Sequence, residues 1–283
     1  MFDIIVVREG MLAECYGAYL WSVVKGCKFL TTPPLTQMEK ADLAVIRDKN
    51  ILIVGGYYRD NMEPIVEAAK EVTVFYNSSD VIRNVPPHEL LTPLEFTGFL
   101  TWTIEQLSIE DEHILLIGRY LDEYLYGYPS DESLYFQKGV YTIDKDTDLN
   151  KLLTIRCVED MVNILVKGQE KTIGDRRIAE QRCKSAKEFT FELEGKSYSA
   201  LVTIGDSPIV ETCLLLAKKS SSGVGMLFRY DISTGKTFIS TRSTKESGID
   251  AGVLMNKLVK GGGSKVMGGG SISKLVFPDQ LLV

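Results

Sequence analysis

Two short apolar runs separated by a helical pattern place the strongest constraint on the fold of this chain. The segments ILIVGG (51–56) and VTVFYNSS (72–79) are apolar runs that end in turn-forming residues. Between them, MEPIVEAAKE (62–71) spaces its apolar residues at helical intervals. This order predicts a βαβ unit of a parallel sheet. Sites in such sheets form at the carboxyl ends of the strands, so the loops after Val7, Val54 and Phe75 are candidate positions for a site.

The flanking segments extend this pattern into two domains. FDIIVV (2–7) predicts a strand, and GMLAECYGAYLWSVVKG (10–26), PLEFTGFLTWTIEQL (93–107) and HILLIGRYLDEYLYGY (113–128) predict helices. A long helical stretch, softly broken near Gly174, is followed by a hairpin, a helix, two strands and a last helix before a glycine run. We therefore predict an α/β protein with an N-terminal parallel-sheet domain, 1–156, a helical connector, 157–187, and a smaller C-terminal α+β domain, 188–283.

Composition and cysteine usage indicate an ordinary globular protein. Of the 283 residues, 45% are hydrophobic and 25% are charged. The five cysteines are widely spaced and never form CxxC, so we predict buried thiols, not a disulfide framework or a structural zinc. No apolar run approaches membrane-spanning length, and the N-terminal run is too short for a signal peptide. We expect no membrane association and a cytoplasmic location, in the host cytoplasm if the protein is viral.

The charge of the chain is strongly polarised. Residues 61–150 hold 17 acidic and 5 basic side chains, a net charge of −12, whereas the rest of the chain has a net charge of +6. A surface of one sign attracts a partner of the other, and the alternative is a solvated acidic face that only aids solubility. The acidic residues that we assign to a partner-binding surface are Glu110, Asp111, Glu112, Asp122, Glu123, Asp131, Glu132, Asp144, Asp146 and Asp148.

The common metal and catalytic motifs are absent from the sequence. DKDTDLN (144–150) has the alternating carboxylates of a calcium loop, but Leu149 stands at the glycine position and Ile155 at the glutamate position. The two histidines, His88 and His113, follow no strand end and no elbow turn. We predict no metal site and no cofactor.

The glycine-rich C-terminal segment, FISTRSTKESGIDAGVLMNKLVKGGGSKVMGGGSI (238–272), resembles the substrate-binding domain of the DHH phosphoesterase superfamily. In that family an Arg-Ser pair on a strand, a short helix and a GGGH loop handle phosphorylated or nucleotide ends. Bare backbone N–H groups can approach phosphate oxygens closely. The resemblance implies a ligand site at Arg242, Ser243, Gly261, Gly262, Gly263 and Ser264, the last at the histidine position. The alternative is a salt bridge for the arginine and a tight turn for the glycines.

The N-terminal segments resemble the same family but lack its active-site residues. VVREGMLAECYGAYL (6–20), the βαβ segment and LLIGRYLDEYLYG (115–127) are similar to its metal-binding segments in order and spacing. The resemblance places the family's metal ligands on Tyr16, Gly55, Tyr76, Asn77, Ser78 and Asp122, of which only the last is a carboxylate. Active members hold a pair of manganese or magnesium ions, and one carboxylate cannot hold two hard cations. We therefore expect a degenerate member, a pseudoenzyme; a generic two-domain α/β protein is the alternative.

Three functions remain open at this stage. The first is a protein-binding module whose acidic surface imitates nucleic acid and blocks the RNA- or DNA-binding site of a basic partner enzyme, as a viral inhibitor would. The second is a phosphodiesterase with an altered site, in which Asp122 and Asp60 share one ion. The third is a nucleotide sensor that uses only the C-terminal glycine loop. Direct nucleic-acid binding is not expected from so acidic a region.

A group of tyrosines suggests self-association. Tyr120, Tyr124, Tyr126 and Tyr128 lie beside the acidic residues, and tyrosine is enriched at protein interfaces. We expect a homodimer, and a core role for some of these side chains is the alternative.

Overall fold

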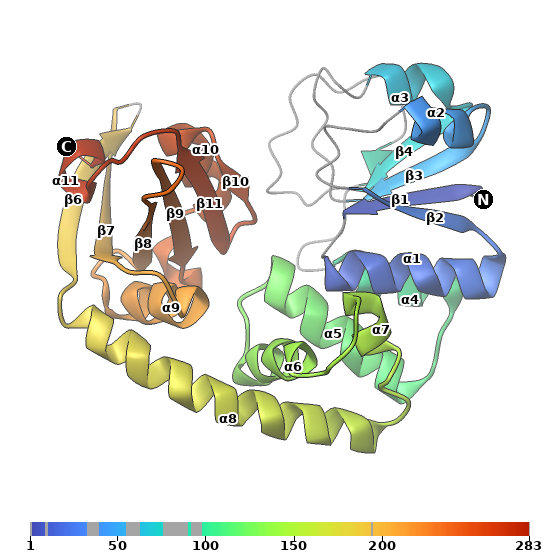
Figure 1. Cartoon of the computed structure of the whole chain (residues 1–283), viewed down its shortest axis with the longest axis horizontal. Helices are drawn as coiled ribbons and strands as arrows, with labels where there is room; N and C mark the ends of the chain where they lie inside the picture. Colours follow the sequence, from blue (N-terminus) through green and yellow to red (C-terminus); the bar gives the residue numbers. More distant parts are fainter. Residues whose placement is uncertain are drawn as a thin grey trace. The chain divides into compact units, whose positions relative to one another are not determined.

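The chain forms two compact units, Met1–Gly168 and Gln169–Val283 (Figure 1). The structure is a computed structural model that describes residues 2–8, 11–32, 40–54, 63–75, 90–91, 98–193 and 195–282. The division falls inside the long helix α8, Val158–Cys183. The domain limits at 156/157 and 187/188 stay predictions.

A five-stranded parallel sheet forms the centre of the N-terminal unit. Its strands lie in the order β2-β1-β3-β4-β5, and each neighbouring pair is parallel. The strands are β1 Ile4–Arg8, β2 Lys28–Thr32, β3 Asn50–Val54, β4 Glu71–Phe75 and β5 Leu90–Leu91. Helix α3, Glu63–Ala68, joins β3 to β4, which confirms the predicted βαβ unit.

Helices cover both faces of this sheet, which explains why its central strands β1 and β3 are nearly continuous apolar runs. Ile5 and Val7 point into one hydrophobic cluster and Ile4 and Val6 into another, because successive side chains of a strand face opposite sides. The remaining helices of this unit are α1 Leu12–Lys25, α2 Lys40–Ile46, α4 Phe99–Leu107, α5 Glu112–Tyr126, α6 Asp131–Tyr141 and α7 Asp148–Leu152. Among the described residues, no helix is both long and apolar enough to cross a membrane.

The C-terminal unit is a six-stranded mixed sheet with helices packed against it. Its strands lie in the order β10-β11-β9-β8-β7-β6, and only the β7–β8 pair is parallel. The elements are β6 Lys187–Leu193, β7 Lys196–Ile204, α9 Ile209–Lys219, β8 Val224–Asp231, β9 Lys236–Ser243, the 3-10 helix η3 Lys245–Ser247, α10 Ala251–Val259, β10 Gly262–Gly263, β11 Met267–Ile272 and α11 Pro278–Leu281. This architecture confirms the predicted α+β class.

The glycine run is not a loop but a hairpin at the edge of this sheet. Gly262 pairs with Gly269 and Gly263 with Gly268 in an antiparallel ladder. Glycine is required by packing, since a Cβ on Gly261 would lie 2.2 Å from the Gly269 carbonyl oxygen. A Cβ on Gly268 would lie 2.4 Å from the carbonyl oxygen of Ala251, at the start of α10. Bare backbone thus lets β11 lie directly against α10.

Two other expectations were wrong. Helix α8 continues through Gly174 without a break, because one glycine costs only about 1 kcal/mol in a helix that is held on both sides. Cys157 is exposed and Cys183 is partly exposed, whereas Cys15, Cys27 and Cys213 are buried as predicted. Residues 93–97 of the predicted helix 93–107 lie outside the described residues, and α4 begins at Phe99.

Candidate functional site

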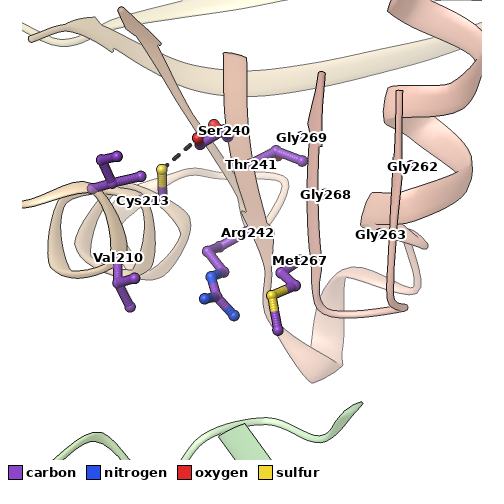
Figure 2. A pocket seen from close by; sticks show the side chains of 11 residues that line it. Val210, Cys213, Ser240, Thr241, Arg242, Gly262, Gly263, Met267, Gly268 and Gly269 are labelled. Atoms are coloured by element: carbon purple, nitrogen blue, oxygen red, sulfur yellow. Dashed lines mark hydrogen bonds between the residues drawn. The ribbon is translucent and has the colours of Figure 1, made fainter. Parts of the chain in front are cut away.

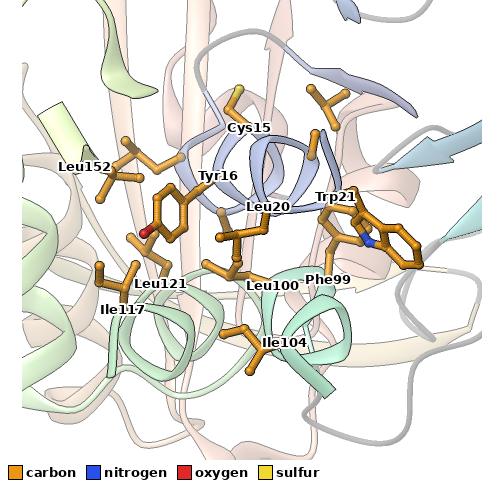
Figure 3. Close-up of a cluster of buried hydrophobic side chains, with 14 of the residues drawn as sticks. Cys15, Tyr16, Leu20, Trp21, Phe99, Leu100, Ile104, Ile117, Leu121 and Leu152 are labelled. Carbon is orange, nitrogen blue, oxygen red and sulfur yellow. The ribbon is translucent and has the colours of Figure 1, made fainter. Parts of the chain in front are cut away.

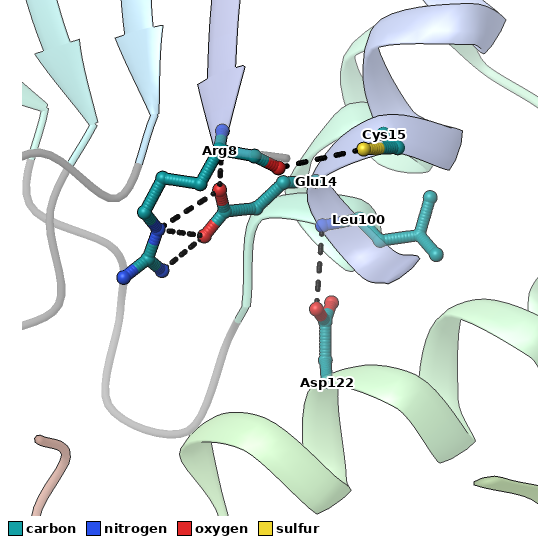
Figure 4. A network of polar contacts seen from close by, with 5 residues as sticks. All are labelled: Arg8, Glu14, Cys15, Leu100 and Asp122. Carbon is teal, nitrogen blue, oxygen red and sulfur yellow. Dashed lines mark hydrogen bonds and ion pairs between the residues drawn. The ribbon is translucent and has the colours of Figure 1, made fainter. Parts of the chain in front are cut away.

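The carboxyl end of β1 carries an ion pair between Arg8 and Glu14. The Glu14 carboxylate is 0% exposed, at the first turn of α1. The Arg8 Nε donates to both carboxylate oxygens, at 3.1 and 3.2 Å, its Nη2 donates to Oε1, and its backbone N–H donates to Oε2 at 3.2 Å (Figure 4). The planar guanidinium fork matches the carboxylate, so the buried charge of Glu14 is compensated by a side chain of the same edge.

Asp122 is a buried helix cap. This residue of α5 is 2% exposed, and its carboxylate accepts hydrogen bonds from the backbone N–H groups of Thr101, at 2.6 Å, and Leu100, at 3.4 Å. A Cβ on Gly98 would lie 2.2 Å from the Asp122 Cγ, so only glycine admits the carboxylate at the start of α4. Burial raises the pKa of Asp122 to about 6, although these hydrogen bonds lower it. The negative charge of Glu14 adds to the rise. Asp122 therefore stabilises the first turn of α4.

Tyr16 is part of the hydrophobic core. It is 4% exposed, lies in the cluster that contains Ile117, Leu121 and Leu152 (Figure 3), and stacks on Tyr19 with ring centroids 6.1 Å apart. Burial raises the pKa of its phenol to about 12. A neutral, buried phenol is not a ligand for a hard cation.

The described residues at this edge do not fit a centre of two divalent ions. Such ions require several oxygen ligands each, and the two carboxylates present are already held by Arg8 and by the N-terminus of α4. Among the described residues, no group of three or more His, Cys, Asp and Glu side chains could hold a metal ion. The other positions that the resemblance implied, Gly55, Tyr76, Asn77 and Ser78, and the alternative ligand Asp60, lie outside the described residues.

The C-terminal unit contains a pocket of about 260 Å³ beside Arg242. Figure 2 shows the guanidinium between Val210 of α9 and Met267 of β11, with the glycines of the hairpin along one wall. Arg242 is 5% exposed, and the nearby Cys213 has a pKa raised to about 12 by burial, which keeps its thiol protonated. The pocket thus combines a buried guanidinium, a group whose geometry matches a phosphate, with the backbone of the glycine hairpin.

Three of the six predicted ligand residues line this pocket. These are Arg242, Gly262 and Gly263. Gly261 packs on the opposite strand, and the Ser243 hydroxyl donates to the Lys265 carbonyl at 3.0 Å. The buried Ser264 hydroxyl has no hydrogen-bond partner within the described part of the chain.

The acidic residues are concentrated at helix ends. Asp144, Asp146 and Asp148 lie between the end of α6 and the first residue of α7. Glu110, Asp111 and Glu112 lie at the start of α5, Glu123 near its end, and Asp131 and Glu132 at the start of α6. These two helices pack together and are joined by a short turn, which places their connected ends side by side. Most of these side chains are exposed, but Asp122 is buried and is not accessible to a partner.

Three of the four predicted interface tyrosines are partly buried in the N-terminal unit, and the side chain of Tyr126 lies outside the described part of the structure. The Tyr120 ring lies against Phe136 with centroids 5.6 Å apart, at the edge of the core. Tyr124 and Tyr128 are also partly buried. This favours a core role for Tyr120, and the homodimer stays a prediction.

The parallel sheet followed by a smaller mixed α+β unit defines a DHH phosphoesterase-like fold. The chain is similar to the pGpG-specific phosphodiesterase PggH from Vibrio cholerae, with 9% identity, a TM-score of 0.51, and coverage of 95% of this chain and 93% of that one. It is also similar to RecJ from Thermus thermophilus in complex with Mn²⁺, with 15% identity and a TM-score of 0.50. That match covers 94% of this chain but 49% of RecJ. No family model and no curated protein matches the sequence.

Proposed function

We propose that this protein is a catalytically inactive phosphoesterase-like protein that acts by binding. The observation that carries the proposal is the position of Asp122, the one carboxylate that the resemblance retains as a metal ligand. It is buried, and its oxygens accept the N–H groups that begin α4. The same carboxylate cannot cap a helix and supply several ligand positions of a two-ion centre. A protein with this fold can then act through its surface and through the pocket beside Arg242.

The partner that best fits the surface of the N-terminal unit is a basic protein, for example an enzyme that binds RNA or DNA. Seven exposed acidic side chains lie on α5, α6 and the turns beside them: Glu110, Asp111, Glu112, Asp131, Glu132, Asp144 and Asp146. Their exposure at the helix ends gives this part of the surface a concentrated negative charge, as the phosphates of nucleic acid do. Such a surface would block a nucleic-acid site by charge complementarity.

A capture experiment at two salt concentrations tests this proposal. The tagged protein is incubated with a nuclease-treated cell lysate. We expect it to retain a stoichiometric basic protein at about 50 mM NaCl. At about 500 mM NaCl it should lose at least about nine-tenths of that protein, because salt screens exposed charges. The variant Glu110→Gln/Asp144→Asn/Asp146→Asn should retain much less. The control Asp206→Asn/Glu246→Gln/Asp279→Asn neutralises three exposed acids of the other unit and should bind normally. Equal retention by both triple variants would contradict the acidic surface.

A turnover assay separates this proposal from an altered phosphodiesterase. We expect no hydrolysis of dinucleotides or of a chromogenic phosphodiester by the purified protein with Mn²⁺ or Mg²⁺. Turnover that disappears in the variant Asp122→Asn would establish a metal-dependent enzyme and end the proposal of an inactive one.

The pocket beside Arg242 favours a second candidate function, the binding of a small phosphorylated ligand such as a nucleotide. Its buried guanidinium and the backbone of Gly262 and Gly263 line one cavity. If this pocket binds phosphate, Arg242→Ala should weaken the affinity for the best nucleotide by about 10- to 100-fold in calorimetry, since charged hydrogen bonds are each worth about 1.5–3 kcal/mol. The control Lys260→Ala removes an exposed cation at the end of α10. Unchanged affinity for every nucleotide in a folded Arg242→Ala variant would dismiss the pocket.

A further inference from the structure

The buried carboxylate of Glu14 is stabilised by a positive charge beside it. It is fully removed from solvent in the first turn of α1, between the apolar residues Ala13 and Cys15, which are also buried. An ionised carboxylate buried without a partner is among the most unfavourable groups in a folded protein. A positive charge beside Glu14 removes much of this cost.

The cation is supplied by the strand that the carboxylate faces. Arg8 is the last residue of β1, which lies inside the sheet between β2 and β3. Its guanidinium contacts both oxygens of Glu14, and its own backbone N–H adds a further bond to one of them. The side chain and the backbone of Arg8 thus both donate hydrogen bonds to the Glu14 carboxylate. These bonds join the end of β1 to the start of α1.

A second carboxylate lies within electrostatic range of this pair. The charge of Glu14 acts on Asp122 of α5, so two acidic groups from different helices converge at the carboxyl end of β1 (Figure 4). In an open parallel sheet this is the edge where ligands bind. Among the described residues, this edge holds the guanidinium of Arg8. The carboxylates of Glu14 and Asp122 do not fit a centre of two divalent ions.

We propose that Arg8 is a permanent, covalently attached counter-cation at this edge, which makes the N-terminal unit independent of divalent metal ions. A guanidinium remains charged at any physiological pH and cannot dissociate, unlike an ion held by the same carboxylates. A divalent ion would have to displace Arg8 from Glu14 before it could bind there. The proposal deepens the inactive-enzyme proposal, since it names the residue that takes the electrostatic role of a metal, but it does not depend on the acidic partner surface.

The test compares unfolding of the full chain with and without metal. For the unchanged protein we expect the same unfolding midpoint in EDTA, in about 1 mM Mg²⁺ and in about 1 mM Mn²⁺, because an ion that does not bind the folded chain does not stabilise it. Arg8→Met should raise the unfolding equilibrium constant by about 100-fold or more, because it leaves a buried charge without its partner. Glu14→Gln should have a smaller effect, since Arg8 is partly exposed and can be solvated.

The double variant Arg8→Met/Glu14→Gln gives the decisive comparison. If Arg8 serves to neutralise Glu14, removal of both charges should recover at least about tenfold of the loss caused by Arg8→Met alone. Arg8→Lys should retain part of the stability, and Arg119→Met, which removes an exposed cation of α5, should change it little. The proposal is overturned if the double variant is no more stable than Arg8→Met. It is also overturned if Mn²⁺ stabilises the unchanged protein. Turnover in the hydrolysis assay without such stabilisation would refute the inactive-enzyme proposal but leave the role of Arg8 intact.

Discussion

Replacement of Gly168 by alanine should destabilise the N-terminal unit by at least about 2 kcal/mol, because the added methyl group has no space. A Cβ at this position of α8 would lie 1.7 Å from the carbonyl oxygen of Tyr135, in the backbone of α6. Ile164, one turn earlier in α8, makes a similar close approach, since its carbonyl oxygen would lie 2.0 Å from a Cβ on Gly139. The helices would have to separate. Urea unfolding followed by circular dichroism measures the change.

Gly174→Ala is the matched control for this prediction. It adds the same methyl group to the same helix, at an exposed position with no atom within 4 Å of the new Cβ. We expect it to stabilise the protein by about 0.5–1 kcal/mol, because alanine favours the helix over glycine. The difference between the two variants isolates the helix–helix contact. Similar stabilities would show that α6 and α8 do not meet at Gly168.

The buried carboxyl of Asp122 should make the protein less stable as the pH rises from about 4 to about 6. The folded-state pKa is about 6, against 3.8 for the ordinary side chain, so in this range the folded chain binds a proton that the unfolded chain has lost. Stability falls with pH wherever the native state binds more protons. The full loss of stability is on the order of 3 kcal/mol, from about 1.4 kcal/mol for each unit of pKa, and it levels off about one pH unit above the folded-state pKa. Urea unfolding at intervals of half a pH unit measures it.

Asp122→Asn is the variant that assigns this pH dependence. Its amide oxygen can still accept a bond from Thr101, and it does not titrate, so the decline between pH 4 and 6 should become much shallower. Glu112→Gln neutralises an exposed acid of the same helix and should leave the slope unchanged. A slope that is equal in Asp122→Asn and in the unchanged protein would assign the titration to another group.

Local patterns predicted most elements because they agree with the tertiary structure. The continuous β-branched run of β1 is typical of a strand buried on both faces, and the alternation in β6 and β7 indicates a hairpin. Strand β11 was missed because three of its six residues are glycine, which has no strand preference. Its conformation is determined by its pairing with β9 and its packing on α10, and neither can be read from a local pattern.

The candidate site was predicted less completely, because its contacts join residues that are distant in the sequence or separated by a turn. Asp122 was identified as a surviving carboxylate, but its bonds to Leu100 and Thr101 span more than twenty residues. The Arg8–Glu14 pair was missed. Its signal was an acidic residue in the apolar face of α1, shortly after an arginine at the end of an apolar strand. A charge at a position that the helical period assigns to the core requires a partner, and the nearest arginine was the candidate.

The packing of the glycine hairpin affects how distant relatives of this chain should be compared. Gly261 and Gly268 are fixed by the closeness of neighbouring backbone, so natural selection would retain them in lineages that bind a ligand and in lineages that have stopped binding one. A shared glycine motif is therefore poor evidence of shared chemistry. Arg242 is more informative, because its charged side chain lines the pocket and takes no part in the close backbone packing of the hairpin glycines. Replacement of Arg242 in a relative that keeps these glycines would therefore indicate that its pocket no longer binds the same ligand.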